Sequence, residues 1–242
     1  MRLQGARVLV AGGAHRVGRA VALDLAQAGA GVAISYHSSS EQAHMTGDEI
    51  AANGVRSAVL QADATQPEQM RELVQQAAGA LGGLDVYVHA PSGGFVPTDP
   101  AAVDEALWDW AVDTTAKGFM FGAQAAHAVM REGEDGGVII AITDVAGLQP
   151  WPKFAPHGAA KAAQMYLVKA LAAAWGRDGV RVCGVAPGPV LMPAGVSGDS
   201  EETALGRLGD PADVALAIRY CIEADFFTGQ SLIIDGGRLL RP

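Results

Sequence analysis

A glycine loop near the start of the chain has residue types and a spacing that suit phosphate binding. The segment AGGAHRVGRA, residues 11 to 20, places Gly12 and Gly18 between a short apolar run and a segment of helical period. Gly12 permits a sharp turn, and Gly18 lets a helix begin close to a sheet with its free backbone N–H groups facing a pyrophosphate. Arg16 takes the place of the usual third glycine. It is either a solvated surface residue or a cation beside a phosphate.

A second polar segment follows the next apolar run, and it contains hydroxyl groups without a carboxylate. The chain reads SYHSSS at residues 35 to 40, and Glu41 is the first acid after it. A site for NAD normally offers an acidic side chain here to the ribose hydroxyls. Because Ser38, Ser39 and Ser40 would tolerate a 2′-phosphate and Arg16 would attract one, the sequence favours NADP(H).

The elements that would position these groups alternate along the whole chain. Short apolar runs are followed by Ala-rich segments of helical period, a pattern typical of βαβ units and a parallel sheet. Helices are predicted over residues 18–28, 41–52 and 67–78. Strands are predicted around Val8–Val10, Val32–Tyr36, Ala58–Gln61, Val86–His89, Val138–Ile142, Val182–Val185 and Leu232–Ile234. We therefore expect one α/β domain over residues 1–242, a Rossmann-type doubly wound fold with a seven-stranded parallel sheet and its ligand cleft at the carboxyl ends of the strands.

Composition argues against several other classes of protein. Asp and Glu number 26 against 17 Lys and Arg, a net charge of -9 with no basic run, so nucleic acid is not an expected partner. No apolar stretch approaches the ~18 to 20 residues that cross a bilayer, and Met1–Gly5 does not resemble a signal peptide. A cytoplasmic protein that acts on a small molecule is expected. Cys183 and Cys221 lack CxxC spacing, and the histidines lack HExxH spacing, so we predict buried thiols and no metal site.

Several further segments resemble, in order, the motifs of the short-chain dehydrogenase/reductase family. The resemblance runs from Val8 to Gly237 and rests on LQADAT, HAPSGG, GVIIAITDVAG, HGAAKAA, VAPGPV, RLGDPADVA and FFTGQSLIIDGG. Within the family, the Arg16 loop, YHSSS, Asp144 and the short PGPVLMP stretch look most like pteridine reductases, which reduce biopterin or folate-type rings with NADPH. Many family members are tetramers, so the resemblance implies a homotetramer or a homodimer.

The resemblance also implies which residues bind the cofactor, with Lys161 on the ribose and Asp63 beside the adenine. The implied set is Gly12, His15, Arg16, Val17, Gly18, Tyr36, His37, Ser38, Ser39, Asp63, Ala64, Ala90, Pro91, Ser92, Lys161, Pro187, Gly188 and Val190.

The catalytic set departs from the family pattern of Asn, Ser, Tyr and Lys, of which only Lys161 is kept. His157 stands in the place of the tyrosine, and Asp144 in that of the serine, as it does in pteridine reductases. Thr115 replaces the helix asparagine. Met192 stands where a threonine usually meets the carboxamide of the cofactor.

This altered set can still support proton transfer. An imidazole with an ordinary pKa of ~6.5 is a workable proton donor near neutrality, so we predict that His157 is the general acid and Asp144 orients it. Lys161 would supply positive charge near the transition state. An imidazole reaches about 2 Å less far than a phenol, and mispositioning by ~1 Å can cost ~100-fold in rate.

Two functions therefore stay open at this point. One is an NADPH-dependent reductase of a small carbonyl or a pterin-like C=N bond, with an Asp144, His157, Lys161 and Thr115 centre. The other is a non-catalytic NADP(H)-binding protein with a sensor or structural role. Trp151 and Phe154, after the fifth predicted strand, are candidates for a substrate wall. Core or subunit-interface positions are expected for Trp108, Trp110, Phe119 and Phe121.

Overall fold

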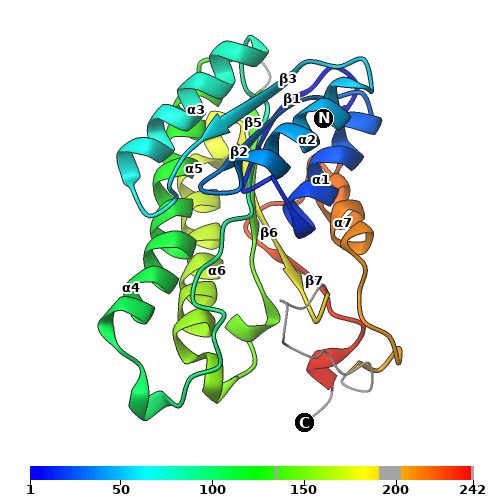
Figure 1. The fold of residues 1–242 in the computed structure, drawn as a ribbon. Coiled ribbons are helices and arrows are strands. Elements are labelled where there is room, and N and C mark those ends of the chain that lie inside the picture. Colours follow the sequence, from blue (N-terminus) through cyan, green and yellow to red (C-terminus); the bar gives the residue numbers. More distant parts are fainter. Residues whose placement is uncertain (134–135, 191–202, 241–242) are drawn as a thin grey trace.

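Seven parallel strands form one sheet in the computed structural model, which describes residues 1–133, 136–190 and 203–240 (Figure 1). The sheet order is β3-β2-β1-β4-β5-β6-β7. The strands are β1 (Arg7–Ala11), β2 (Gly31–Tyr36), β3 (Ser57–Gln61), β4 (Val86–His89), β5 (Gly137–Ile142), β6 (Val180–Pro187) and β7 (Ser231–Ile234). The predicted fold class and all seven predicted strands are confirmed.

Helices cover both faces of this sheet. They are α1 (Arg16–Gln27), α2 (Ser40–Ala51), α3 (Pro67–Leu81), α4 (Glu105–Val112), α5 (Gly118–Met130), α6 (Ala155–Trp175) and α7 (Pro211–Glu223). In Figure 1, α1, α2 and α7 lie on one side of the sheet and α3, α5 and α6 on the other. Because successive side chains of a strand point to opposite faces, β1 sends Val8 and Val10 into one core and Leu9 into the other.

The strand order reverses at β1. The strands β2 and β3 lie on one side of β1, and β4 to β7 lie on the other. Val8 pairs with Val32 of β2 on one side and with Val86 of β4 on the other, although β2 and β4 are far apart in sequence. Segments that leave the carboxyl ends of β1 and β4 therefore run in opposite directions. A crevice is expected at such a switch point.

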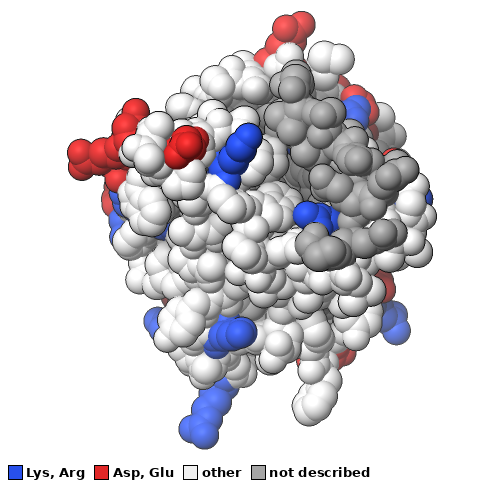
Figure 2. Space-filling view, turned by 90° about the horizontal axis from the view of Figure 1, so that it is seen from below, with Lys and Arg blue, Asp and Glu red and all other residues white. Residues whose placement is uncertain are grey.

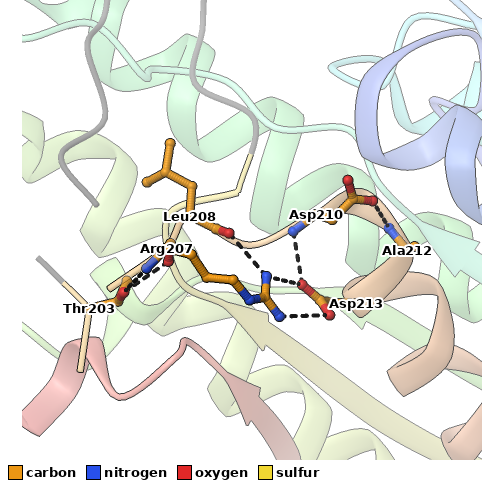
Figure 3. A network of polar contacts seen from close by, with 6 residues as sticks. All are labelled: Thr203, Arg207, Leu208, Asp210, Ala212 and Asp213. Atoms are coloured by element: carbon orange, nitrogen blue, oxygen red, sulfur yellow. Dashed lines mark hydrogen bonds and ion pairs between the residues drawn. The ribbon is translucent and has the colours of Figure 1, made fainter. Parts of the chain in front are cut away.

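Local sequence signals set where individual helices begin and end. Pro67 occupies the first turn of α3, and Gly82 ends that helix in the left-handed region with φ 77°. At the start of α7, the Asp210 carboxylate accepts from the Ala212 N–H, and the Asp213 carboxylate accepts from the Asp210 N–H. Arg207 donates to the Leu208 carbonyl and to Asp213, which closes the network in Figure 3. These bonds fix the turn that leads into α7.

A π-type turn, Asp113–Lys117, joins α4 to α5. Beneath it, the Nε2–H of His89 donates to the Thr114 carbonyl at 3.3 Å, and the Tyr87 hydroxyl donates to His89 Nδ1 at 2.8 Å. Burial lowers the pKa of His89 to about 3, so its ring is neutral and has one donor and one acceptor for these two bonds. The buried pair of side chains thus anchors the turn that contains Thr115.

Other features of the fold bear on the remaining predictions. In the described ranges, no helix combines the length and the apolar character needed to cross a membrane, and no group of three His, Cys, Asp or Glu side chains could hold a metal ion. Cys183 and Cys221 are free and buried. Phe119 is buried, whereas Trp108 and Trp110 are 46% and 47% exposed. Of the two positions expected for these tryptophans, core or subunit interface, the core is therefore excluded, and the interface stays a prediction.

Candidate active site

A cleft of about 950 Å³ lies at the carboxyl ends of the strands. The segments after β1 to β6 and the first turns of α6 line it, and all of the predicted cofactor-binding residues are among them. Of the four predicted catalytic residues, Asp144, His157 and Lys161 line the cleft and Thr115 does not. Figure 2, seen from below Figure 1, shows that uncharged residues dominate that face of the molecule, with a few basic side chains among them.

The glycine loop after β1 is packed too tightly for side chains. A Cβ atom on Gly18 would lie 2.2 Å from the Gly12 carbonyl oxygen, and Gly12 itself has φ +71°. Gly12 N–H donates to the Ser35 hydroxyl at 3.1 Å, which holds the loop against β2. The first turn of α1 therefore begins directly at the cleft, and its backbone N–H groups have the position that phosphate binding requires.

Arg16 is the only non-glycine residue with a positive φ in the described parts of the chain, at 53°. The left-handed conformation costs a residue with a Cβ roughly 1–2 kcal/mol, and glycine avoids this cost. Arg16 thus adopts a backbone conformation that favours glycine, and it also lines the cleft. Such an outlier points to a function of the side chain.

The far end of the cleft offers hydroxyl groups at the end of β2 and one carboxylate at the end of β3. Ser38 and Ser39 line this end. Asp63 accepts from the backbone N–H of Thr65 at 2.9 Å and from its hydroxyl at 2.8 Å, and His37 Nε2 lies 3.8 Å from Asp63 Oδ2. The segment directly after β2 contains no carboxylate, as the sequence shows, and its Ser38 and Ser39 line the cleft.

His157 lies in the first turn of α6 with one ring nitrogen fixed by the backbone. Its Nδ1–H donates to the Gly93 carbonyl at 3.2 Å. Its Nε2 lies 3.5 Å from Asp144 Oδ2, and this contact does not have the geometry of a hydrogen bond. The two predicted partners therefore meet. When the ring is neutral, the Nε2 lone pair faces the carboxylate.

Lys161 and Asp144 complete the centre. Lys161, one helical turn after His157, is 3% exposed and donates to the Ile142 carbonyl at 2.7 Å. Burial lowers its pKa to about 8, and the charge of Asp144 opposes this shift. Asp144 follows β5, and its Oδ1 accepts from the Ala146 N–H at 2.8 Å, which fixes the carboxylate beside His157.

Thr115 is buried behind the wall of the cleft instead of facing it. Its hydroxyl accepts from the Gly93 N–H at 3.2 Å. Gly93 is therefore bonded at its N–H to the π turn and at its carbonyl to His157. Sequence reasoning missed Gly93, although the glycine pair in HAPSGG was a signal that could have found it. A Cβ at Gly93 would lie 2.4 Å from the Trp110 carbonyl oxygen.

An aromatic wall, formed by Phe95, Trp151 and Phe154, stands beside His157. Phe95 stacks on Phe154 with ring centroids 4.5 Å apart, and it meets the His157 ring edge-to-face at 5.0 Å. The ring centroids of Trp151 and Phe95 are 6.5 Å apart. Trp110 also lines the cleft. Trp151 and Phe154 were predicted as candidates for such a wall, whereas Phe95 was not. Met192 lies outside the described residues.

Known proteins match this chain over nearly its whole length. A family model described as "Enoyl-(Acyl carrier protein) reductase" matches residues 12–238. The curated protein 3beta-hydroxysteroid dehydrogenase 1 of Eggerthella lenta is 32% identical over 252 residues, which cover 99% of this chain and 96% of that protein. A crystal structure of a short chain dehydrogenase from Burkholderia cenocepacia in complex with NADP has a TM-score of 0.92 and 31% identity, covering 99% of this chain and 100% of that one. Acetoin dehydrogenase YohF from Salmonella typhimurium has a TM-score of 0.89 and 30% identity, covering 99% and 98%.

Proposed function

Because the chain belongs to the short-chain dehydrogenase/reductase family, we propose that it is an NADPH-dependent reductase of a small carbonyl or a pterin-like C=N bond. One observation carries the proposal. A single cleft joins the phosphate-binding end of the glycine loop to Asp144, His157 and Lys161. We further propose that residues 1–242 form one domain and that the protein assembles as a homodimer or homotetramer.

The residues present fit a dinucleotide with a 2′-phosphate. Gly18 allows the close approach of loop and helix, because a Cβ there would collide with the Gly12 carbonyl. The start of α1 and Arg16 would hold phosphate, and Ser38 and Ser39 would face the 2′-phosphate without repelling it. Lys161 would hold the ribose hydroxyls. The structure of the Burkholderia cenocepacia relative is a complex with NADP, which supports this choice of cofactor.

When bound, NADPH supplies a hydride from its nicotinamide ring, and the protein's own residues have to manage the proton. Because the Gly93 carbonyl holds the Nδ1–H of His157, the proton that this ring can pass to a substrate is on Nε2. Asp144 Oδ2 lies 3.5 Å from Nε2, so the carboxylate faces the nitrogen that donates the proton. After the proton leaves Nε2, the ring stays oriented by Gly93, so it can be protonated again in place. Lys161 adds positive charge to the same region.

The proposal is tested by measuring NADPH oxidation with a panel of ketones, aldehydes and cyclic imines. We expect turnover with at least one class, at a rate that rises with protein concentration. Cofactor binding is measured separately by fluorescence titration. NADPH binding without any turnover would instead support the non-catalytic alternative.

The Arg16→Gly variant is expected to separate the two cofactors. Losing a charge-assisted hydrogen bond costs about 1.5–3 kcal/mol, so the Kd for NADPH should rise roughly 10- to 100-fold while that for NADH changes little. Glycine suits φ 53°, so the fold should tolerate the change. The measurement is parallel titration of both cofactors, with Arg19→Ala as the control because Arg19 pairs with Glu49 on the surface. Equal loss for both cofactors, or tighter binding of NADH by the unaltered protein, would contradict the proposed 2′-phosphate site.

Cofactor affinity is also expected to depend on the charge of Lys161. Its lowered pKa means that the ammonium form predominates below about pH 8 and is lost as the pH rises through that value. A protein that binds the anionic cofactor through this ammonium should therefore bind it more weakly above pH 8, by at most tenfold per pH unit. The Kd for NADPH is measured from pH 6.5 to 9.5. In Lys161→Met, the affinity should be lower throughout and its decline above pH 8 should be absent; an unchanged decline in that variant would assign it to another group.

A further inference from the structure

The described residues that line the cleft differ in charge from the chain as a whole. The net charge of the chain is -9. Four basic side chains and two carboxylates line the cleft: Arg16, Lys153, Lys161, Arg238, Asp63 and Asp144. A cleft lined mainly by one sign of charge concentrates ligands of the opposite sign. Phosphate groups of the cofactor would use part of this positive charge, and the positions of the cations show which part is left.

These charges divide between the two halves of the sheet. Arg16 and Asp63 follow β1 and β3, in the half where the glycine loop and the serines after β2 would hold phosphate groups. The other four charged residues follow β5 or β7, which lie on the other side of β1 in the sheet order. Because the carboxyl ends of parallel strands meet at one edge of a sheet, the segments after β5 and β7 can face one substrate. Three of these four residues are basic.

Lys153 stands in the turn Pro152–Phe154, between the aromatic wall residues Trp151 and Phe154. Backbone bonds fix this turn, since the Thr98 N–H donates to the Lys153 carbonyl at 2.8 Å and the Phe154 N–H donates to the Trp151 carbonyl at 2.8 Å. The Lys153 side chain is exposed, and no carboxylate in the described ranges forms an ion pair with it. Its ammonium group therefore stands at the rim of the cleft beside the aromatic wall.

Arg238 reaches the cleft from another direction. It begins the short turn Arg238–Leu240, which follows β7. The Gly188 N–H donates to the Ile234 carbonyl at 3.1 Å, and this bond holds the end of β7 against a segment that lines the cleft. The Asp235 carboxylate in the same loop accepts from two backbone N–H groups at 2.8 Å. Arg238 is half-buried, where a guanidinium group binds a carboxylate more strongly than an exposed ammonium group does.

The remaining two charges of this half, Lys161 and Asp144, offset each other. The Lys161 ammonium group is buried, donates to the Ile142 carbonyl and attracts the carboxylate of Asp144. Protonation of His157 would add a further positive charge. The reacting centre therefore has no net negative charge that would repel an anion. Lys153 and Arg238 are left for an anionic group away from the bond that is reduced.

We propose that Lys153 and Arg238 form an anion site at the substrate end of the cleft, and that this site binds a carboxylate that the substrate carries in addition to its reducible carbonyl. The inference rests on the proposed reductase function and names the substrate class as an oxo acid. The carbonyl takes a hydride from NADPH at its carbon and the Nε2 proton of His157 at its oxygen. The products are a hydroxy acid and NADP⁺, and the carboxylate is unchanged.

Binding of matched compounds tests the anion site without turnover. The protein is first saturated with NADP⁺, which fills the phosphate-binding end of the cleft. It is then titrated calorimetrically with 4-acetylbenzoate and with its methyl ester, a neutral compound of similar shape, and with the 3-acetyl pair, in which the two groups are closer. We expect the acid of at least one pair to bind about tenfold or more tightly than its ester. Raising NaCl from about 50 to about 500 mM should reduce the difference, because salt screens exposed charges.

Four variants assign the preference to the two cations. Lys153→Met and Arg238→Met should each lower the ratio of ester Kd to acid Kd by about threefold or more, and the double variant should bring it near one. Lys169→Met, the same change at an exposed position of α6 outside the cleft, should leave the ratio unaltered. Arg238→Lys keeps the charge and should retain most of the preference, which separates loss of charge from damage to the turn. Equal binding of acid and ester in both pairs, or a preference that survives in the double variant, would overturn the inference.

Turnover with NADPH separates this inference from the proposed function. The substrates are the same ketones and the corresponding aldehydes, 4-formylbenzoate and its methyl ester. A kcat/KM about tenfold or more higher for an acid than for its ester would support both proposals. Faster reduction of the esters would leave the reductase function intact and overturn the carboxylate site. Selective binding of an acid without reduction of any compound would overturn the proposed function, and the anion site would remain supported.

Discussion

Replacing His157 by alanine is expected to lower kcat/KM for NADPH-dependent reduction about 10²- to 10⁴-fold, the usual contribution of a general acid. The Kd for NADPH should change less than about threefold, because the ring bonds to the Gly93 carbonyl and faces Asp144 at the substrate end of the cleft. Steady-state kinetics and cofactor titration on the same preparation measure the two effects. Thermal unfolding shows whether the variant folds.

Two further variants make this prediction specific. His157→Gln keeps a polar side chain of similar size that is not an acid, so it should be nearly as inactive as the alanine variant. Tyr166→Phe removes a phenol five residues beyond Lys161 that is 70% exposed, and it should leave kcat/KM within about twofold of the unaltered value. Activity that survives in both His157 variants would mean that another group donates the proton. Loss of cofactor affinity together with activity would assign His157 to cofactor binding.

The sequence predicted the fold because its signals are local and repeated. Each apolar run is short and ends near a glycine or a polar residue, and each following segment has a helical period. The alternation that buries Val8 and Leu9 in opposite cores is visible in the residues of a single strand. The cleft followed from the topology, because the carboxyl ends of parallel strands meet at one edge of a sheet.

That Asp144, His157 and Lys161 would lie together could be predicted for a similar reason. His157 and Lys161 are four residues apart on α6, so they share one side of that helix. Asp144 is the second residue after β5, which brings it to the same edge. Thr115 differs, because its hydroxyl bonds to a backbone N–H of another loop instead of facing the cleft. Nothing in the residues around Thr115 indicated that partner.

The residues that were missed depend on contacts between distant segments and on an irregular turn. Gly93 and His157 are 64 positions apart, and no periodic pattern links them. The π turn between α4 and α5 inserts a residue relative to a regular helix, which offsets the faces before and after it. A regular helical period therefore could not show that Trp110 lines the cleft while Phe119 lies in the core.

Substitution of Gly93 by alanine is expected to lower kcat/KM by about 100-fold, because the peptide that orients His157 would be displaced. The new Cβ would lie 2.4 Å from the Trp110 carbonyl oxygen and 3.1 Å from the Thr114 hydroxyl. Because the first of these atoms is backbone, the Gly93 loop itself has to move. Both of its hydrogen bonds, to Thr115 and to His157, would lengthen. A shift of ~1 Å at a reacting group can cost ~100-fold in rate, and overpacking costs about 1–3 kcal/mol of stability.

A matched glycine and a double-mutant cycle separate this positioning role from a general loss of stability. Gly79→Ala adds a methyl group on α3 with no atom within 4 Å, so it should preserve activity and raise stability by about 0.5–1 kcal/mol. Thr115→Val removes the acceptor for the Gly93 N–H and should also lower kcat, with little change in the Kd for NADPH. Because both substitutions act through one peptide, their combined effect on kcat/KM should be smaller than the product of the single effects. Fully multiplicative losses, or a Gly93→Ala rate equal to that of Gly79→Ala, would show that the peptide does not position His157.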